Sequence, residues 1–225
     1  SSSLLAAAGL GEPMIAARTD AQDTPQPVSQ TEPSHSRSTA CEGAAEEASA
    51  LALGALSATL HQLGDLLAAA TDEQYVQHPV GVIHSSLGAH IRHCLDHFEA
   101  LCSAGESGRL NYDDRQRGTP VETSRTAGLE AIARLSAGLW RLGASQLDRA
   151  VRLTPMMLEN GAAIEVQSSL GRELAFVLSH TIHHNALVAA MCRTLGIPAP
   201  ERFGYAPATL AHLDAAACAP SPLSR

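Results

Sequence analysis

Apolar residues recur at helical spacing in four long segments of the chain, with polar residues between them. In the first segment these positions are Leu51, Leu56, Leu60, Leu63 and Leu67. The pattern predicts helices over about residues 44–70, 87–104, 126–148 and 170–195. Long helices and few β-branched residues are typical of an all-α fold, and we expect a four-helix bundle.

The segment between the third and fourth predicted helices has a different pattern. Two short apolar stretches, around Val151 and Val166, lie on either side of Asn160-Gly161. Asn-Gly is a favoured two-residue hairpin turn because both residues tolerate positive φ. We therefore predict a small β-hairpin between helices 3 and 4 of the bundle.

A short motif, Ser-Ser-Leu-Gly, occurs twice in the chain. It covers residues 85–88 at the start of the second predicted helix and residues 168–171 at the start of the fourth. A serine at such a position accepts hydrogen bonds from the free N–H groups of the first turn. The repeat marks two helix starts and is too short to indicate a duplication.

Both ends of the chain lack this apolar periodicity. Residues 1–42 are rich in Ser, Thr, Pro, Gln and Asp, and residues 215–225 are similar. We expect both segments to be disordered and residues 43–214 to form one domain. Apolar runs fall short of the roughly 20 residues that cross a bilayer, and no basic segment precedes the first apolar patch. Neither a membrane span nor a signal peptide is predicted.

Charge and cysteine content argue against several classes of protein. The net charge is −8 without any basic run, which argues against a nucleic-acid partner. All 15 cations are arginine, which excludes a Schiff-base lysine. Five cysteines without CxxC spacing argue against a disulfide framework or a cysteine zinc site. We interpret Cys94, Cys102 and Cys192 as buried thiols in a reducing compartment, and expect a cytoplasmic protein.

The fourth predicted helix carries a pair of histidines suited to binding metal. His180 and His184 are four residues apart, so their rings lie on one face, one turn apart. On a helical wheel both fall inside the apolar arc, as does Glu173, whereas His183 lies at its edge. Burying these groups costs several kcal/mol unless a metal ion or hydrogen bonds offset the cost.

The second predicted helix offers further ligands. His90, His93 and His97 form one stripe beside its apolar face, and the spacing does not choose among them. One residue from this stripe would complete a three-histidine site with open positions, the pattern of a catalytic metal site. The plainer interpretation is that hydrogen bonds in the core satisfy these histidines, and spacing alone supports both equally.

Two segments resemble the DinB-like, or YfiT-like, helical-bundle superfamily, and the resemblance extends over about residues 50–214. Residues 86–93 resemble its second-helix segment, whose closing histidine is a metal ligand and matches His93. Residues 179–187 resemble its fourth-helix segment, whose two ligands match His180 and His184. The resemblance therefore implies a divalent metal ion held by His93, His180 and His184.

The superfamily binds zinc, nickel, iron or manganese, and its characterised members include S-transferases and isomerases that use low-molecular-weight thiols. The resemblance implies a small-molecule substrate and a thiol cosubstrate, because the chain offers no obvious nucleophile. Glu173, His97 and Asp96 are then candidates to orient the ligands or to accept a proton. The family often has Arg-Gly after the double histidine. This chain has Asn185-Ala186 there, so a role for that arginine does not transfer.

Two further segments carry candidate chemistry outside these motifs. Residues 111–120 join the second and third predicted helices and contain two aspartates followed by Arg115 and Arg117. The plainer interpretation is a surface ion-pair loop, and the alternative is an entrance loop whose arginine binds an anionic substrate group. We interpret Tyr205 as a packing aromatic, with a place over the mouth of the site as the alternative.

The sequence leaves two main interpretations of function. The first is a metal-dependent enzyme, of thiol-dependent transferase or hydrolase type, whose metal lowers the pKa of a coordinated thiol or water. The second is a non-catalytic, stress-related metal-binding bundle, able to form a homodimer. A fourth protein ligand such as His97 would favour the second. The iron-dependent sulfoxide synthase type, where such a bundle joins a larger catalytic domain, is the least favoured interpretation.

Overall fold

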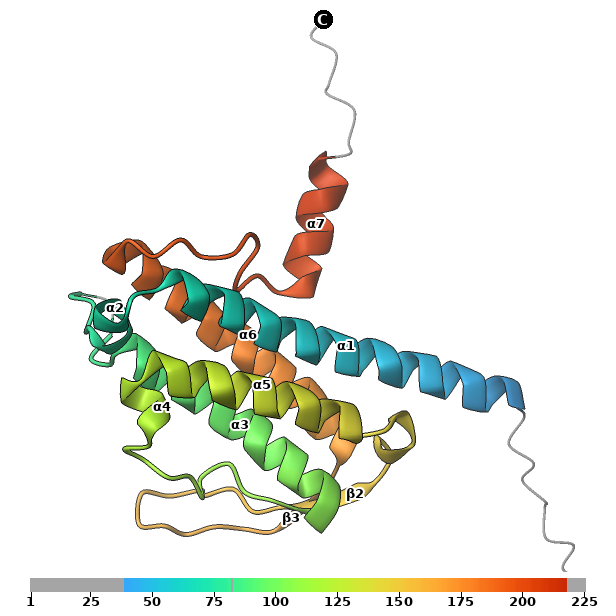
Figure 1. Ribbon diagram of the computed structural model, residues 1–225. Coiled ribbons are helices and arrows are strands. Elements are labelled where there is room, and N and C mark those ends of the chain that lie inside the picture. The colour runs from blue at the N-terminus through green and yellow to red at the C-terminus, as the bar shows by residue number, and fades with distance from the viewer. Residues whose placement is uncertain (1–38, 82, 218–225) are drawn as a thin grey trace, which may run out of the picture. The chain divides into compact units, whose positions relative to one another are not determined.

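Four long helices pack side by side and form the body of the protein. The computed structural model describes residues 39–81 and 83–217. The long helices are α1 (Thr39–Ala69), α3 (Leu87–Ser107), α5 (Arg125–Arg141) and α6 (Leu170–Leu195). Helices α1 and α3 each pack against both α5 and α6, which closes the bundle (Figure 1). The predicted mostly helical bundle is confirmed.

Shorter elements connect the long helices. In the described residues they are α2 (Asp72–Val76), α4 (Pro120–Thr123), a 3₁₀ helix, η1 (Ala144–Gln146), and α7 (Pro207–Ala217). None of these was predicted. One or two turns of helix leave little periodic signal in a sequence. Helix α7 is longer, with 11 residues, but its alanine-rich sequence shows little contrast between an apolar and a polar face. The described part of the chain therefore has more helices than the four expected.

Leucines from α1 fill the centre of the bundle. Four of the five predicted positions on α1 are fully buried, namely Leu56, Leu60, Leu63 and Leu67. Leu51 was expected on the same face but is 76 % exposed. The spacing explains the difference, because Leu51 is five residues before Leu56 and the 3.6-residue repeat carries it off the buried stripe.

Two helix boundaries differ from the expected ones. Helix α5 ends at Arg141 rather than at residue 148, because Leu142 leaves helical geometry, Gly143 follows, and η1 tightens the chain. Helix α1 begins at Thr39, inside the segment expected to be disordered, and α7 extends to Ala217, past the expected domain end. The rest of the predicted disordered ends, residues 1–38 and 218–225, lies outside the described residues.

The predicted hairpin is present as part of a small sheet. Strands β2 (Ala150–Leu153) and β3 (Val166–Ser169) pair antiparallel, and β1 (Arg109–Leu110) pairs parallel to β2. The expected two-residue turn is wrong. Only Gly161 of the Asn-Gly pair has positive φ, and its N–H donates to the carbonyl of Leu158, so Glu159 and Asn160 are the central residues of the turn.

Helix α6 meets the length and hydropathy required of a membrane span, contrary to the sequence expectation. A third of its most apolar stretch, 33 %, is buried inside the protein. This test alone is weak evidence for a span, because packed core helices also pass it, and α6 packs against α1 and α3.

Candidate metal centre

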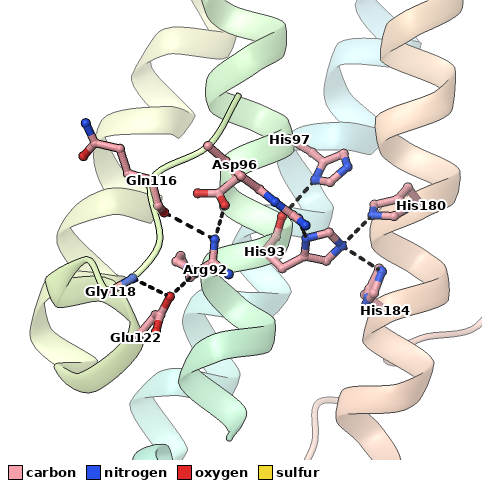
Figure 2. Close-up of polar contacts among 10 residues, drawn as sticks. Arg92, His93, Asp96, His97, Gln116, Gly118, Glu122, His180 and His184 are labelled. Atoms are coloured by element: carbon pink, nitrogen blue, oxygen red, sulfur yellow. Dashed lines mark hydrogen bonds and ion pairs between the residues drawn. The ribbon is translucent and has the colours of Figure 1, made fainter. Parts of the chain in front are cut away.

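Histidines from α3 and α6 converge in the space between the two helices (Figure 2). Nε2 of His93 lies 3.1 Å from Nε2 of His180 and 3.2 Å from Nε2 of His184. The structure thus brings together the three residues that the sequence singled out. Their role as metal ligands remains a prediction.

His97 belongs to the same group. One ring nitrogen from each of His93, His97 and His180 lies within 4.8 Å of the other two. Nδ1–H of His97 donates to the backbone carbonyl of His93 at 2.9 Å, which leaves Nε2 of His97 with a free lone pair. We call His93, His97, His180 and His184 the histidine cluster.

The imidazoles of the cluster are neutral at pH 7. Burial, with smaller contributions from neighbouring histidines and Arg115, lowers the pKa of His93 to about 3. The pKa values of His180 and His184 fall to about 4, again mainly through burial. Burial also lowers the pKa of His97. Neutral imidazole is the form that binds metal, so no proton has to be displaced from a positively charged ring.

The spacing of the ring nitrogens fits one divalent ion. Tetrahedral bonds of about 2.0–2.1 Å place ligand nitrogens about 3.3–3.4 Å apart, close to the 3.1 and 3.2 Å observed around His93. Nδ1 of His184 is buried and has no hydrogen-bond partner in the described residues. Nε2 of His184 is thus the atom that faces His93 and the proposed ion, and its Nδ1 would carry the proton.

Arg115 was expected in a surface ion-pair loop, but its side chain contacts the histidine cluster. Its Nη1 lies 2.5 Å from Nδ1 of His93. A guanidinium only donates, so Nδ1 accepts, and the proton of neutral His93 is on Nε2. His93 can offer Nε2 to a metal ion only when this proton moves to Nδ1, so Arg115 must then turn away.

Two anchors hold the loop that carries Arg115. At its start, the hydroxyl of Tyr112 donates to Glu173 at 2.9 Å. At its end, Arg92 of α3 donates to the carbonyl of Gln116 and pairs with Glu122 at 2.6 Å (Figure 2). The expected surface ion-pair loop is therefore wrong for Arg115, which forms no ion pair among the described residues and lies against the histidine cluster.

Glu173 has a structural position rather than contact with the cluster. Its side chain is fully buried and accepts hydrogen bonds from Tyr112, Ser168 and Arg172. Its link to the cluster is indirect, because the Tyr112 ring stacks on His97 at a centroid distance of 4.9 Å. The inward orientation predicted for Glu173 is confirmed, and we assign it the task of fixing Tyr112.

Asp96 is a neighbour of His93 on the surface of α3 but makes no contact with the cluster among the described residues. It accepts a hydrogen bond from Arg92 at 2.5 Å and borders a cavity that contains none of the cluster histidines. Burial raises its pKa, against the opposing effect of Arg92 and Arg115. The third candidate, His97, is inside the cluster itself, where it offers a ligand atom.

His90 completes the stripe on α3 but stands apart from the cluster. Both of its ring nitrogens are buried without a hydrogen-bond partner in the described residues, and its ring centroid is 5.7 Å from that of His184. Tyr205 does not cover the cluster. Its side chain is 51 % exposed and borders a groove along α6 that includes His183.

Cys94, Cys102 and Cys192 offer no reactive thiol. Cys94 and Cys192 are buried, as expected, and Cys102 is partly buried. Burial raises the pKa of Cys94 to about 12 and the pKa values of Cys102 and Cys192 to about 11. These thiols are protonated at neutral pH, so none is a ready nucleophile.

Comparisons with known proteins agree with this architecture. Residues 55–188, more than half of the chain, match the family model described as the DinB superfamily. This stretch includes all four histidines of the cluster.

A curated fungal protein is also similar. It is "FK506-binding protein 5" of Rhizopus delemar, which is 37 % identical over 110 residues, covering 46 % of this chain and 27 % of that protein. The chain thus spans about a quarter of the length of this relative. No solved structure matches the chain.

Proposed function

This chain belongs to the DinB superfamily, and we propose that it binds one divalent metal ion in the histidine cluster. The observation that carries the proposal is the convergence of neutral imidazole nitrogens from α3 and α6 at 3.1 and 3.2 Å. His93, His180 and His184 are the proposed ligands, with His97 close enough to join them. An all-imidazole donor set suits zinc, nickel or iron better than manganese, which prefers oxygen ligands.

We further propose that the protein is a metal-dependent enzyme acting on a small molecule. A bound divalent ion would supply a Lewis acid that lowers the pKa of a coordinated thiol or water. The chain's own groups hold and shape the site. His97 is oriented by the His93 carbonyl, and the Tyr112 ring covers one face of His97. Since Cys94, Cys102 and Cys192 are protonated, a low-molecular-weight thiol is the proposed cosubstrate in a cytoplasmic setting.

A non-catalytic role is the second candidate, and the position of His97 favours it. A structural metal site takes four protein ligands, whereas a catalytic one leaves a position for water or substrate. His97 and His184 both lie next to His93 and His180. If His97 and His184 both bind the ion, the site has four protein ligands and the protein stores or senses metal. If only one of them binds, a position stays open for water or substrate.

Metal content of variant proteins tests the proposal. Protein purified without a metal-affinity tag is incubated with zinc, desalted and examined by elemental analysis. Wild type should retain one ion per chain, and His180→Ala should lose most of it because it removes a central ligand. His183→Ala is the matched control, since His183 is on the same helix but exposed. Equal metal in wild type and His180→Ala would refute the proposal.

The same preparations separate enzyme from binder. They are assayed with a panel of low-molecular-weight thiols and a chromogenic electrophile. Activity that is present in wild type and His183→Ala but absent from His180→Ala supports the enzyme. A metal-loaded protein that is inactive with every thiol would contradict the transferase proposal. The non-catalytic metal-binding role would then be the supported one.

A further inference from the structure

The cavity that Asp96 borders lies beside α3 and reaches Arg115, which contacts His93 of the cluster. Its volume is about 820 Å³, within the range of sites for small molecules. It is bordered by α3, α5, β1 and the loop that carries Arg115, and none of the cluster histidines lines it. Nothing in the proposed metal function uses this space.

The cavity carries charges of both signs, and its arginines differ in how far carboxylates neutralise them. Four arginines line it against three carboxylates, in a chain whose net charge is −8. Arg92 is occupied, because Asp96 and Glu122 both pair with it. Arg134 meets Glu99 only at 3.4 Å, and its side chain is more than half exposed.

Arg115 forms no direct ion pair in the described part of the chain, although its charge acts on nearby Asp96. The one hydrogen bond of its guanidinium among the described residues is to the neutral ring of His93. Arg109, on β1, also lines the cavity and forms no ion pair in the described part of the chain. A half-buried guanidinium with unused donors binds a carboxylate strongly, because two parallel N–H groups match its two oxygens.

The rest of the cavity wall combines apolar and uncharged polar side chains. Leu95, Leu110, Val121 and Ala131 border it, and three of these four are buried, while six polar residues such as Asn111 also line it. A matching ligand therefore has one anionic group and a small body that meets both apolar and polar side chains. We propose that this cavity binds a small organic carboxylate, with Arg115 as the residue that holds the carboxylate group.

The inference goes beyond the proposed metal function and does not depend on it. Arg115 borders the cavity and touches His93, so the bound carboxylate would lie close to the histidine cluster. Because binding is measured on metal-free protein, failure of the metal proposal would leave this one intact, and the reverse also holds.

Titration with benzoate tests the proposal. The metal-free full chain is labelled with ¹⁵N, and amide shifts are followed as benzoate or its neutral analogue benzamide is added. Benzoate should shift amides of residues 110–116 and bind at least about tenfold more tightly than benzamide, as expected for a charge-assisted bidentate pair.

Arginine variants identify the residue responsible. Arg115→Gln should weaken benzoate binding about tenfold or more. Arg117→Gln is the matched control, because Arg117 is exposed on the same loop and does not line the cavity, and it should change affinity less than about twofold.

Three results would overturn the proposal. One is no saturable benzoate binding to wild type, and another is equal binding of benzoate and benzamide. The third is equal affinity in folded Arg115→Gln and wild type. The wild-type comparison of the two probes decides the question even when Arg115→Gln fails to fold.

Discussion

The imidazoles of the histidine cluster are uncharged because their surroundings disfavour a proton. Burial is the main cause for His93, His180 and His184, and each ring would also repel a charge on its neighbours. In the unfolded chain the same side chains titrate near pH 6.5. This difference between the two states makes the stability of the fold depend on pH.

Acid should therefore destabilise the metal-free protein in a defined range. The folded pKa values of about 3 to 4 lie below the unfolded value, so protons bind the unfolded chain first. The contribution of the neutral cluster is complete above about pH 6.5 and is lost as pH falls towards 4. Thermal unfolding in the presence of a chelator should show a lower midpoint at pH 5 than at pH 7.

A histidine variant separates the cluster from other titrating groups. His180→Gln should reduce the difference between the two midpoints, because one ring no longer gains a proton on unfolding. His78→Gln changes an exposed histidine and should keep the wild-type difference. A His180→Gln protein with the full wild-type dependence on pH would show that the cluster is not the source.

At the residue level, the sequence predicted the positions of the two proposed ligands on α6 but not their surroundings. The i, i+4 spacing placed His180 and His184 on one face, and the family resemblance selected His93. Spacing alone could not do so, since all three histidines of α3 share a stripe. The sequence could not predict the contact of Arg115 with His93, because this contact depends on long-range hydrogen bonds of Tyr112 and Arg92 that hold the loop in place.

At the level of elements, the repeated Ser-Ser-Leu-Gly motif has a common physical basis. In both copies the second serine caps its helix, Ser86 accepting from the N–H of Ala89 and Ser169 from that of Arg172. In both, the glycine lies against a carbonyl of another segment. A Cβ on Gly88 would come within 2.2 Å of the carbonyl oxygen of Glu122.

Gly88→Ala should therefore destabilise the protein. The added carbon would also lie 2.7 Å from the Tyr75 ring, so α3 and α4 would have to separate. We expect the free energy of unfolding to fall by about 1–3 kcal/mol. Gly54→Ala is the contrasting variant, because nothing lies within 4 Å of the point in α1 that its added methyl would occupy. The free energy of unfolding of Gly54→Ala should rise by about 0.5–1 kcal/mol.

Urea denaturation measures both changes in the free energy of unfolding. Unchanged stability in Gly88→Ala would mean that the contact between the start of α3 and α4 is looser than described. Destabilisation by Gly54→Ala would mean that the mid-section of α1 is packed against something at this position.

The long elements were predictable and the short ones were not. Helix α6 was expected over residues 170–195 and is found there, because its apolar period, capping serine and terminal glycine agree. Strand β1 has two residues, and its parallel pairing with β2 joins parts of the chain about 40 residues apart. No local pattern encodes such a pairing.

For the whole molecule, the decisive feature is the adjacency of α3 and α6. These helices are separated in sequence by α4, α5 and the sheet, yet they pack directly together. The periodicity of each helix fixes which residues share a face, but not which helix that face meets. The family resemblance supplied this adjacency, and the convergence of the four rings follows from it.

X-ray absorption at the zinc edge, on protein carrying one zinc ion per chain, tests the central claim most directly. The account predicts a shell of three or four imidazole nitrogens at about 2.0–2.1 Å. The shell should stay intact in His183→Ala, and the zinc that His180→Ala still retains should have one imidazole fewer. A shell of oxygen atoms alone, or the same shell in His180→Ala as in wild type, would contradict it.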